Sequence, residues 1–184
     1  NSDYSNTSID IGLEIAQKFG SRIVASHVYA AKMHDVRFRQ MESGLPEEYQ
    51  EEDELEKQRN IHDQLITKGM EVITDSYLDV PKDRTKKLNI PFEGKSLEGR
   101  NYTELVRDIK ESNYDLVIMG ALGLGAIKDS LIGTVAERVV RRIQTDTLLV
   151  KYIPEIHEER PSSDKIVVAV DGSQQSFGGL KTGM

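Results

Sequence analysis

Short apolar runs rich in β-branched residues alternate along this chain with stretches of helical periodicity. The clearest runs are residues 22–29 (RIVASHVY), 115–119 (DLVIM) and 147–150 (TLLV). The stretches between them contain apolar residues that recur every three or four positions, which is typical of amphipathic helices. This alternation predicts an α/β fold in which a mainly parallel sheet is covered by helices on both faces.

The same patterns predict the remaining elements. We expect helices over residues 4–19 and 47–78, with further helices that begin at Asn101 and at Gly133–Thr134. Asn101 followed by Glu104 resembles a capping box. Residues 88–92 form a weak strand pattern. Residues 30–46 show no period and are predicted to be a loop.

Composition limits the classes of function. The 184 residues suit one domain of ordinary size, and 24 basic against 31 acidic residues give a net charge of −7. An acidic chain is a poor candidate for nucleic-acid binding, which needs a basic surface. There are no cysteines, so disulfides and thiolate metal sites are excluded, and the four histidines share no ligand spacing that would predict a metal site. Apolar runs reach only about five residues, far short of the roughly 20 that span a bilayer, so we expect a cytoplasmic protein without membrane association.

The two ends of the chain share a pattern. The run Ile166–Val170 leads into Asp171-Gly-Ser, and aligning Ser173 with Ser2 also aligns Ser176 with Ser5. The opening helix has no strand before it, whereas the final strand has no full helix after it. We therefore expect part of a tandem protein, with chance similarity as the alternative.

The predicted organisation has three parts. The first is a domain over residues 1–151 without its first strand. The second is a linker over 152–164. The third, residues 165–184, is the first strand and the start of a second repeat.

One glycine motif could hold an anion. Gly120-x2-Gly123-x9-Gly133-Thr134 follows the 115–119 strand and ends where a helix begins. Glycines let backbone N–H groups approach a phosphate closely, and a helix start offers free donors beside the Thr134 hydroxyl. The Walker motif is absent, and position 128 is a lysine where the dinucleotide fingerprint needs glycine. Lys128 could instead reach a phosphate, although a solvated lysine fits equally well.

This motif, after an apolar strand that ends in Met-Gly, resembles the ATP-binding branch of the universal stress protein family over nearly the whole chain. The resemblance implies a Rossmann-like open parallel sheet of five strands in the order 3-2-1-4-5. It also implies a bound adenine nucleotide (ATP, or AMP or ADP, with or without Mg). The residues that it places at the nucleotide are Gly120, Gly123, Gly133, Thr134, Val28, Met119, Ala121 and Asp171.

Within that site the resemblance gives each group a role. The four motif residues would hold the phosphates and ribose, with Met119 and Ala121 lining the same loop. Adenine would lie against Val28 and the aspartate that ends the first strand. The only counterpart of that aspartate is Asp171, at the other end of the chain.

The resemblance also implies how the sheet and the assembly are completed. Family members commonly dimerise through the last strand, here Thr147–Val150, or place two units in one chain as a pseudo-dimer. We expect Ile166–Val170 to fill the empty central position of the sheet, either in the same chain or from a second copy.

Three functions from different classes remain open. The first is an ATP-binding regulator of a stress response, with at most slow hydrolysis, because no residue is placed as an evident general base. The second is an adenine-nucleotide hydrolase of the same architecture. The third is a dimeric regulator that binds no nucleotide. His27, on the first predicted strand, is expected to be a core or rim histidine.

Overall fold

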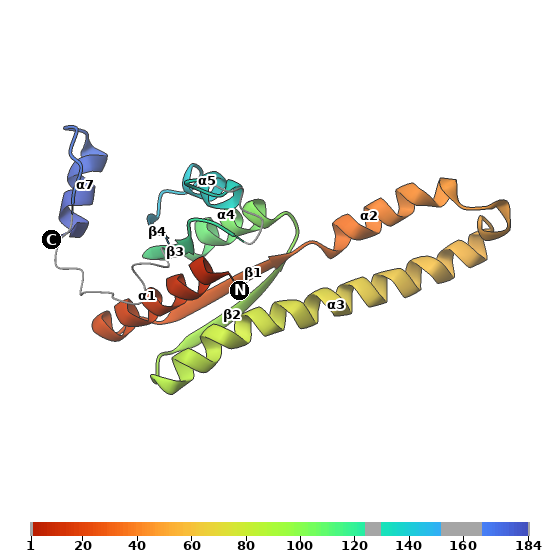
Figure 1. Cartoon of the computed structure of the whole chain (residues 1–184), viewed down its shortest axis with the longest axis horizontal. Coiled ribbons are helices and arrows are strands. Elements are labelled where there is room, and N and C mark those ends of the chain that lie inside the picture. Colours follow the sequence, from red (N-terminus) through yellow and green to blue (C-terminus); the bar gives the residue numbers. More distant parts are fainter. Residues whose placement is uncertain (1, 124–129, 152–166, 184) are drawn as a thin grey trace. The chain divides into compact units, whose positions relative to one another are not determined.

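The structure is a computed structural model that describes residues 2–123, 130–151 and 167–183 of the chain. The chain divides into two compact units, Asn1–Tyr152 and Ile153–Met184, and each is described by itself. The first unit contains the sheets and most of the helices (Figure 1).

The strands of the first unit form two parallel pairs. β1 (Ile23–Tyr29) pairs with β2 (Phe92–Glu98) along its whole length. β3 (Leu116–Gly120) pairs with β4 (Asp146–Val150) in the same way. The prediction of parallel strands is therefore confirmed for both pairs.

The two pairs do not join into the predicted five-stranded sheet. Each is a separate two-stranded sheet, with the orders β1-β2 and β3-β4. The predicted order 3-2-1-4-5 counts the missing first strand as number 1. The pair β1-β2 then corresponds to positions 2 and 3, and the pair β3-β4 to positions 4 and 5, while position 1 has no counterpart among the described strands. Residues 167–170, which were expected to fill it, belong to no strand in the structure, and Ile166 lies outside the described residues. Among the described residues, nothing hydrogen-bonds to the remaining edges of β1 and β3 as a strand.

Helices cover these sheets. In chain order the helices of the first unit are α1 (Asp3–Phe19), α2 (Ala31–Met41), α3 (Glu52–Lys87), α4 (Asn101–Ser112) and α5 (Thr134–Val140). α1 packs against β3, β4 and β1, whereas α3 packs against β1 and β2. α4 contacts β1, β2 and α5. The sheets are thus held between helices, as the alternation of elements predicts.

α1 shows how the sequence sets both ends of a helix. Ser2 caps its start, because Ser2 Oγ accepts a hydrogen bond of 3.2 Å from the Ser5 backbone N–H. Gly20 ends it with φ of 65°, in the left-handed region that glycine tolerates best. Its inner face carries Leu13 and Ala16, which form a buried core cluster with Ile90.

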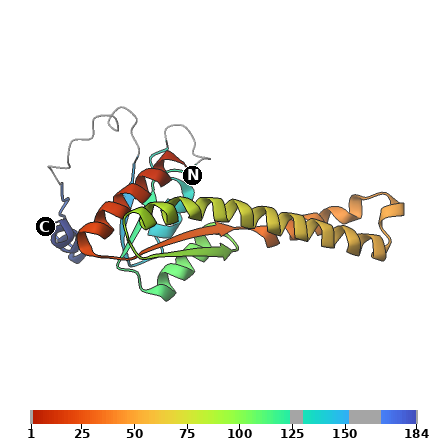
Figure 2. The same cartoon turned by 90° about the horizontal axis from the view of Figure 1, so that it is seen from below.

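The segment 30–46, predicted to be a loop, is mostly helical. It contains α2 and the 3-10 turn Glu42–Gly44, and a second such turn, Glu47–Tyr49, follows. α2 lies alongside the first half of α3, and we call this pair the helical hairpin (Figures 1 and 2). The loop prediction failed because the contacts that hold α2 come from α3 rather than from its own sequence.

Two contacts between distant side chains hold the helical hairpin together. Arg59 donates to both carboxylate oxygens of Glu42, from Nε and Nη2, each over 2.7 Å. The rings of Phe38 and His62 stack with centroids 4.1 Å apart. Both pairs connect residues at or just after the end of α2 to the first third of α3, so they fix the spacing of the two helices.

α3 begins five residues later than the predicted start at residue 47, and it extends further at its carboxyl end than the sequence suggests. It continues through Pro81, where we predicted an end near residue 78, and stops at Lys87. Pro81 and Thr85 are buried on the inner face, so packing outweighs the lost backbone hydrogen bond. The weak strand predicted at 88–92 is instead a turn with Asn89 at φ 55°, and β2 begins at Phe92.

The expected capping box of α4 is also absent. Asn101 is the first helical residue, and the capping position belongs to Arg100, which makes no side-chain cap. Asn101 Oδ1 accepts a hydrogen bond of 2.7 Å from the Tyr102 backbone N–H instead. The helix thus begins one residue earlier than the box requires.

The second unit contains one described helix, α7 (Gln174–Gly183). Its first turn is capped as α1 is capped, because the Ser176 N–H donates to Ser173 Oγ over 3.1 Å. The Ser2/Ser5 pair and the Ser173/Ser176 pair therefore share one local geometry. Among the residues that the structure describes, no helix is both long and apolar enough to cross a bilayer.

Candidate functional site

The two described ends of the glycine loop are held together at the carboxyl end of β3. The Ala121 N–H donates to the Val150 carbonyl over 2.8 Å, which ties the loop to the end of β4. The Gly133 N–H then donates to the Ala121 carbonyl over 2.7 Å. Gly133 is also the residue that precedes α5, so Thr134 opens that helix directly beside the end of β3.

The three motif glycines have different surroundings. A Cβ on Gly120 would lie 2.8 Å from Tyr4 Cβ and 3.0 Å from the Tyr4 carbonyl carbon. A Cβ on Gly133 would lie 3.2 Å from the Ala121 carbonyl oxygen, whereas one on Gly123 would meet nothing within 4 Å. Gly120 is therefore required by the close approach of α1, whereas no described residue lies within 4 Å of where a Cβ on Gly123 would be.

Burial distinguishes the loop residues that pack into the fold from those that a ligand could reach. Ala121 is almost fully buried, with 1% of its surface exposed. Gly123 and Thr134 are exposed. The loop therefore presents one exposed glycine backbone and one hydroxyl group beside a fixed scaffold. Lys128, predicted as a phosphate contact, lies outside the described residues.

The structure does not bring every predicted residue to this loop. Met119 lies in β3 and pairs with Leu149 on β4, directly before the loop. Val28 lies in the other sheet, where it pairs with Leu97 of β2. Asp171 belongs to the second unit, so its expected place at the adenine stays a prediction.

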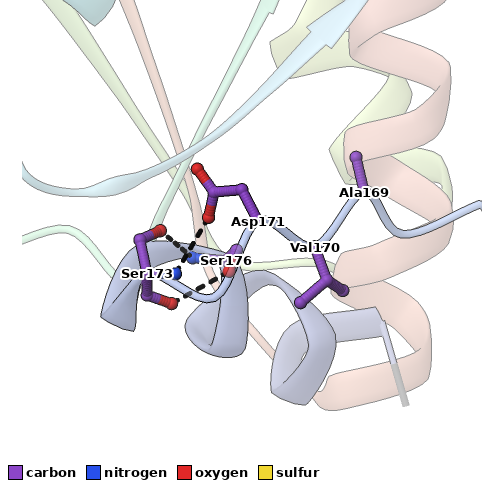
Figure 3. Close-up of a pocket in the computed structure, with 5 residues that line it drawn as sticks. All are labelled: Ala169, Val170, Asp171, Ser173 and Ser176. Atoms are coloured by element: carbon purple, nitrogen blue, oxygen red, sulfur yellow. Dashed lines mark hydrogen bonds between the residues drawn. The ribbon is translucent and has the colours of Figure 1, made fainter.

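Asp171 is engaged by its own helix start. Its Oδ1 accepts a hydrogen bond of 2.9 Å from the Ser173 N–H, and Ala169, Val170, Asp171, Ser173 and Ser176 line an open depression (Figure 3). The hydrogen bond from the Ser173 backbone, aided by the hydroxyls of Ser173 and Ser176, lowers the pKa of Asp171 to about 2. This carboxylate is therefore charged at neutral pH and accepts backbone hydrogen bonds at a helix start.

Three arginines that sequence reasoning missed surround one aromatic ring. The guanidinium carbons of Arg138, Arg142 and Arg100 lie 4.8, 5.6 and 6.0 Å from the centroid of Tyr102. A hydrogen bond from Thr103 and the positive charges of Arg100 and Arg138 lower the pKa of Tyr102.

These arginines form no ion pair with any residue that the structure describes. In a chain of net charge −7 they are a local positive surface at the start of α4, on α5 and in the turn after α5. The signal in the sequence was the four-residue spacing of Arg138 and Arg142, which predicts that the two side chains lie near each other at the end of a helix.

A second polar cluster lies between β2 and α4. Lys95 Nζ donates to Asp108 Oδ1 over 2.7 Å, to Ser112 Oγ over 2.9 Å and to the Tyr114 hydroxyl over 2.9 Å. Tyr114 in turn donates to Asp108 Oδ2 over 2.9 Å. All three ammonium protons have an acceptor, so the cluster joins the helix to the sheet and leaves no charge free for a ligand.

His27 has the environment of a core-rim histidine, as expected. Its Nδ1 lies 3.0 Å from Thr74 Oγ1, and its ring is 4.8 Å from the ring of Tyr77 on α3. Burial lowers the pKa of His27, which favours the neutral ring. Among the described residues, no group of three or more histidine, aspartate or glutamate side chains is placed to hold a metal ion.

Three solved structures with a similar fold are a hypothetical protein and two universal stress proteins. The hypothetical protein MJ0577 is 19% identical with a TM-score of 0.57, covering 83% of this chain and 92% of its own. UspA from Lactobacillus plantarum is 13% identical with a TM-score of 0.60, covering 82% and 91%. A universal stress protein in complex with cAMP is 22% identical with a TM-score of 0.50, covering 82% and 89%.

A search of curated proteins found no match. The model of the universal stress protein family matches residues 1–151, which is most of the chain and includes the glycine loop, α5 and all four strands described above. The chain therefore belongs to the universal stress protein family.

Proposed function

We propose that this protein binds an adenine nucleotide at the glycine loop and acts as an ATP-binding regulator of a stress response. The observation that carries the proposal is the hydrogen bond from Gly133 to the Ala121 carbonyl. It holds both described ends of the loop at the edge where β3 and β4 end. Ligands of open parallel α/β folds bind at this carboxyl edge.

The chemistry of the loop suits phosphate groups. Gly123 has no side chain, and no described residue lies within 4 Å of where one would be, so the described surroundings leave its backbone accessible to a phosphate. The exposed Thr134 hydroxyl can donate a further hydrogen bond. An acidic protein can hold an anion in this way because the donors are neutral backbone and hydroxyl groups.

Charge near the loop supports the same ligand class. Arg138 and Arg142 follow Thr134 on and just after α5, and no described carboxylate neutralises them. Their field favours an anion at this part of an otherwise acidic molecule. The similar universal stress protein that was solved in complex with cAMP supports an adenine nucleotide as the ligand.

The direct test is equilibrium titration of the purified protein with a fluorescent ATP analogue, together with mass spectrometry of any nucleotide that copurifies. We expect saturable binding that unlabelled ATP competes away. A folded sample that takes up no labelled ATP, and retains no nucleotide, would contradict the proposal.

Variants then assign the site to the loop. Gly123→Val should weaken binding by about tenfold or more, because its side chain would occupy the open space where a phosphate approaches. Gly44→Val is the matched control, since Gly44 also has nothing within 4 Å but lies in the turn after α2. Equal affinity in the two variants would place the nucleotide elsewhere.

A further inference from the structure

Three positive charges gather around the ring of Tyr102 without an acidic partner. The guanidinium carbons of Arg100, Arg138 and Arg142 all lie within 6.0 Å of the centroid of that ring. We call these four residues the Tyr102 cluster. Over residues 2–123, 130–151 and 167–183, no carboxylate forms an ion pair with any of the three arginines. Like charges at this separation repel one another, and a bound anion would relieve that repulsion.

Other arginines near the cluster already have acidic partners. Arg107 pairs with Glu104 on α4. Arg141, directly after α5, pairs with Glu137 over 3.0 Å. The acidic side chains of these turns are therefore engaged, and among the described residues the charge of the Tyr102 cluster remains unneutralised.

The cluster lies along the face of α5 that begins at Thr134. Arg138 follows Thr134 by four residues, so the two side chains lie one above the other on the helix surface. Nη1 of Arg142 donates to the Arg138 carbonyl over 2.9 Å, so the Arg142 side chain turns back toward the start of α5. Both arginines are thus directed to the end of the helix that adjoins the glycine loop.

Tyr102 brings the start of α4 to the same edge of the fold. It is the second residue of α4, which follows β2, whereas α5 follows β3 through the glycine loop. Both helix starts therefore come after the carboxyl ends of parallel strands, which is the edge where such folds bind ligands. α4 and α5 pack against each other in the structure (Figure 1).

We propose that the Tyr102 cluster binds the outer phosphate groups of the nucleotide held at the glycine loop, and that it makes the protein prefer ATP to AMP. This inference rests on the proposed function and deepens it by naming the nucleotide that the site selects. The loop donors, the Gly123 backbone and the Thr134 hydroxyl, are neutral and do not depend on the length of the phosphate chain. Guanidinium groups favour the longer and more highly charged chain, and each can donate two parallel hydrogen bonds to it.

The Tyr102 ring acts as a positioning group for the arginines. A guanidinium held over an aromatic ring is attracted by its face and keeps its N–H groups free to donate in the guanidinium plane. Tyr102 is partly buried, whereas Arg100, Arg138 and Arg142 are exposed. The ring is therefore the support, and the guanidinium groups are the part that a phosphate can reach.

The test compares nucleotides that differ only in their phosphate chain. Isothermal titration calorimetry with AMP, ADP and ATP, in buffer without divalent cations, gives three dissociation constants for each variant. We expect the original protein to bind ATP about tenfold or more tightly than AMP, with ADP between them. Arg138→Gln combined with Arg142→Gln should weaken ATP binding by about tenfold or more and AMP binding by less than about threefold.

A matched double variant controls for the loss of charge. Arg107→Gln combined with Arg141→Gln removes the same charge from the same region, but from arginines that already have partners. It should keep the ratio of ATP to AMP affinity of the original protein. AMP binding shows in every variant that the protein is folded and the glycine loop intact.

Substitution of the ring separates positioning from direct binding. Tyr102→Phe keeps the aromatic face and should keep the preference for ATP. Tyr102→Leu removes the face that holds the guanidinium groups, so the preference should fall while AMP affinity changes little.

The possible failures are distinguishable. Equal affinities of the original protein for AMP and ATP, or equal effects of the two double variants on ATP binding, would overturn the inference and leave the nucleotide site in place. A folded protein that binds neither nucleotide would instead contradict the proposed function, and the inference would fall with it.

Discussion

The ammonium of Lys95 on β2 donates a hydrogen bond of 2.7 Å to Asp108 on α4, and the carboxylate is the more buried partner. Burial alone would raise the pKa of Asp108, but the hydrogen bonds from Lys95 and Tyr114 outweigh it and the pKa is lowered. The ion pair thus connects the helix to the strand and keeps a buried carboxylate charged.

Removing the cation should be costly. Lys95→Met leaves Asp108 without its main donor, and we expect a loss of about 1–3 kcal/mol in the free energy of unfolding. Urea denaturation followed by circular dichroism measures this loss. Lys110→Met, which changes an exposed lysine of α4, is the control and should change the midpoint little. Equal midpoints for the two variants would show that the pair contributes nothing.

His27 predicts a pH dependence of stability. Its pKa is lowered from 6.5 in the folded state, so between that lowered value and 6.5 the unfolded state binds more protons. Stability should therefore fall as the pH is lowered from about 7 through this window. His27→Gln should remove that part of the slope, whatever it does to the absolute stability.

The measurement for His27 is the urea midpoint at a series of pH values. His34→Gln, at an exposed position on α2, should keep the slope of the original protein. If His27→Gln and the original protein lose stability in parallel between pH 7 and pH 5, the neutral, partly buried ring of His27 is not the cause.

The motif glycines should separate into structural and ligand-facing residues. Gly120→Ala places a Cβ 2.8 Å from Tyr4 Cβ, so we expect a loss of about 1–3 kcal/mol in stability as α1 shifts. Gly123→Ala meets nothing within 4 Å and should leave the thermal midpoint unchanged. Calorimetry of both variants without nucleotide tests this, and a stable Gly120→Ala protein would contradict the packing seen here.

The two serine caps should have equal local effects. Ser2→Ala and Ser173→Ala each remove the acceptor for a backbone N–H, which typically costs about 1 kcal/mol of helix stability. Hydrogen exchange at the amides of Ser5 and Ser176 should speed up by a similar factor. Ser76→Ala, in the middle of α3, is the control and should alter neither amide. Unequal responses would argue against a repeated cap.

Much of the fold could be predicted because its signals are local. The runs at 22–29 and 115–119 are apolar and β-branched, and they form β1 and β3 nearly as predicted. The opening helix is bounded by Ser2, whose side chain caps the helix start, and by Gly20, whose left-handed backbone ends it; both act within a few residues of the chain. The glycine motif was sufficient to identify the family, and the family model confirms it.

The rest depends on contacts between residues far apart in the sequence. α2 has no apolar period of its own and is held by pairs such as Glu42 with Arg59, which no local pattern reveals. α3 continues past Pro81 because the inner face is buried there. Gly120 was assigned to a nucleotide from its motif, yet its surroundings show that the approach of Tyr4 also requires a glycine.

The central strand and the place of Asp171 stay predictions for a related reason. Both concern residues 165–184, whose local pattern is clear but whose partners would come from another part of the fold. Ser173 and Ser176 could be recognised as a cap because that geometry is complete within four residues. A strand has no such internal hydrogen bonds, so its position cannot be obtained from its own sequence.

The length of α3 has a mechanical consequence. Its later turns pack against β1 and β2, whereas its earlier turns extend beyond the strands beside α2 (Figure 2). Local unfolding of the helical hairpin therefore breaks few apolar contacts and leaves the sheets intact. We expect the backbone amides near Glu52 to exchange with solvent long before those near Thr85. One continuous helix would then contain a part that unfolds early and a part that unfolds late.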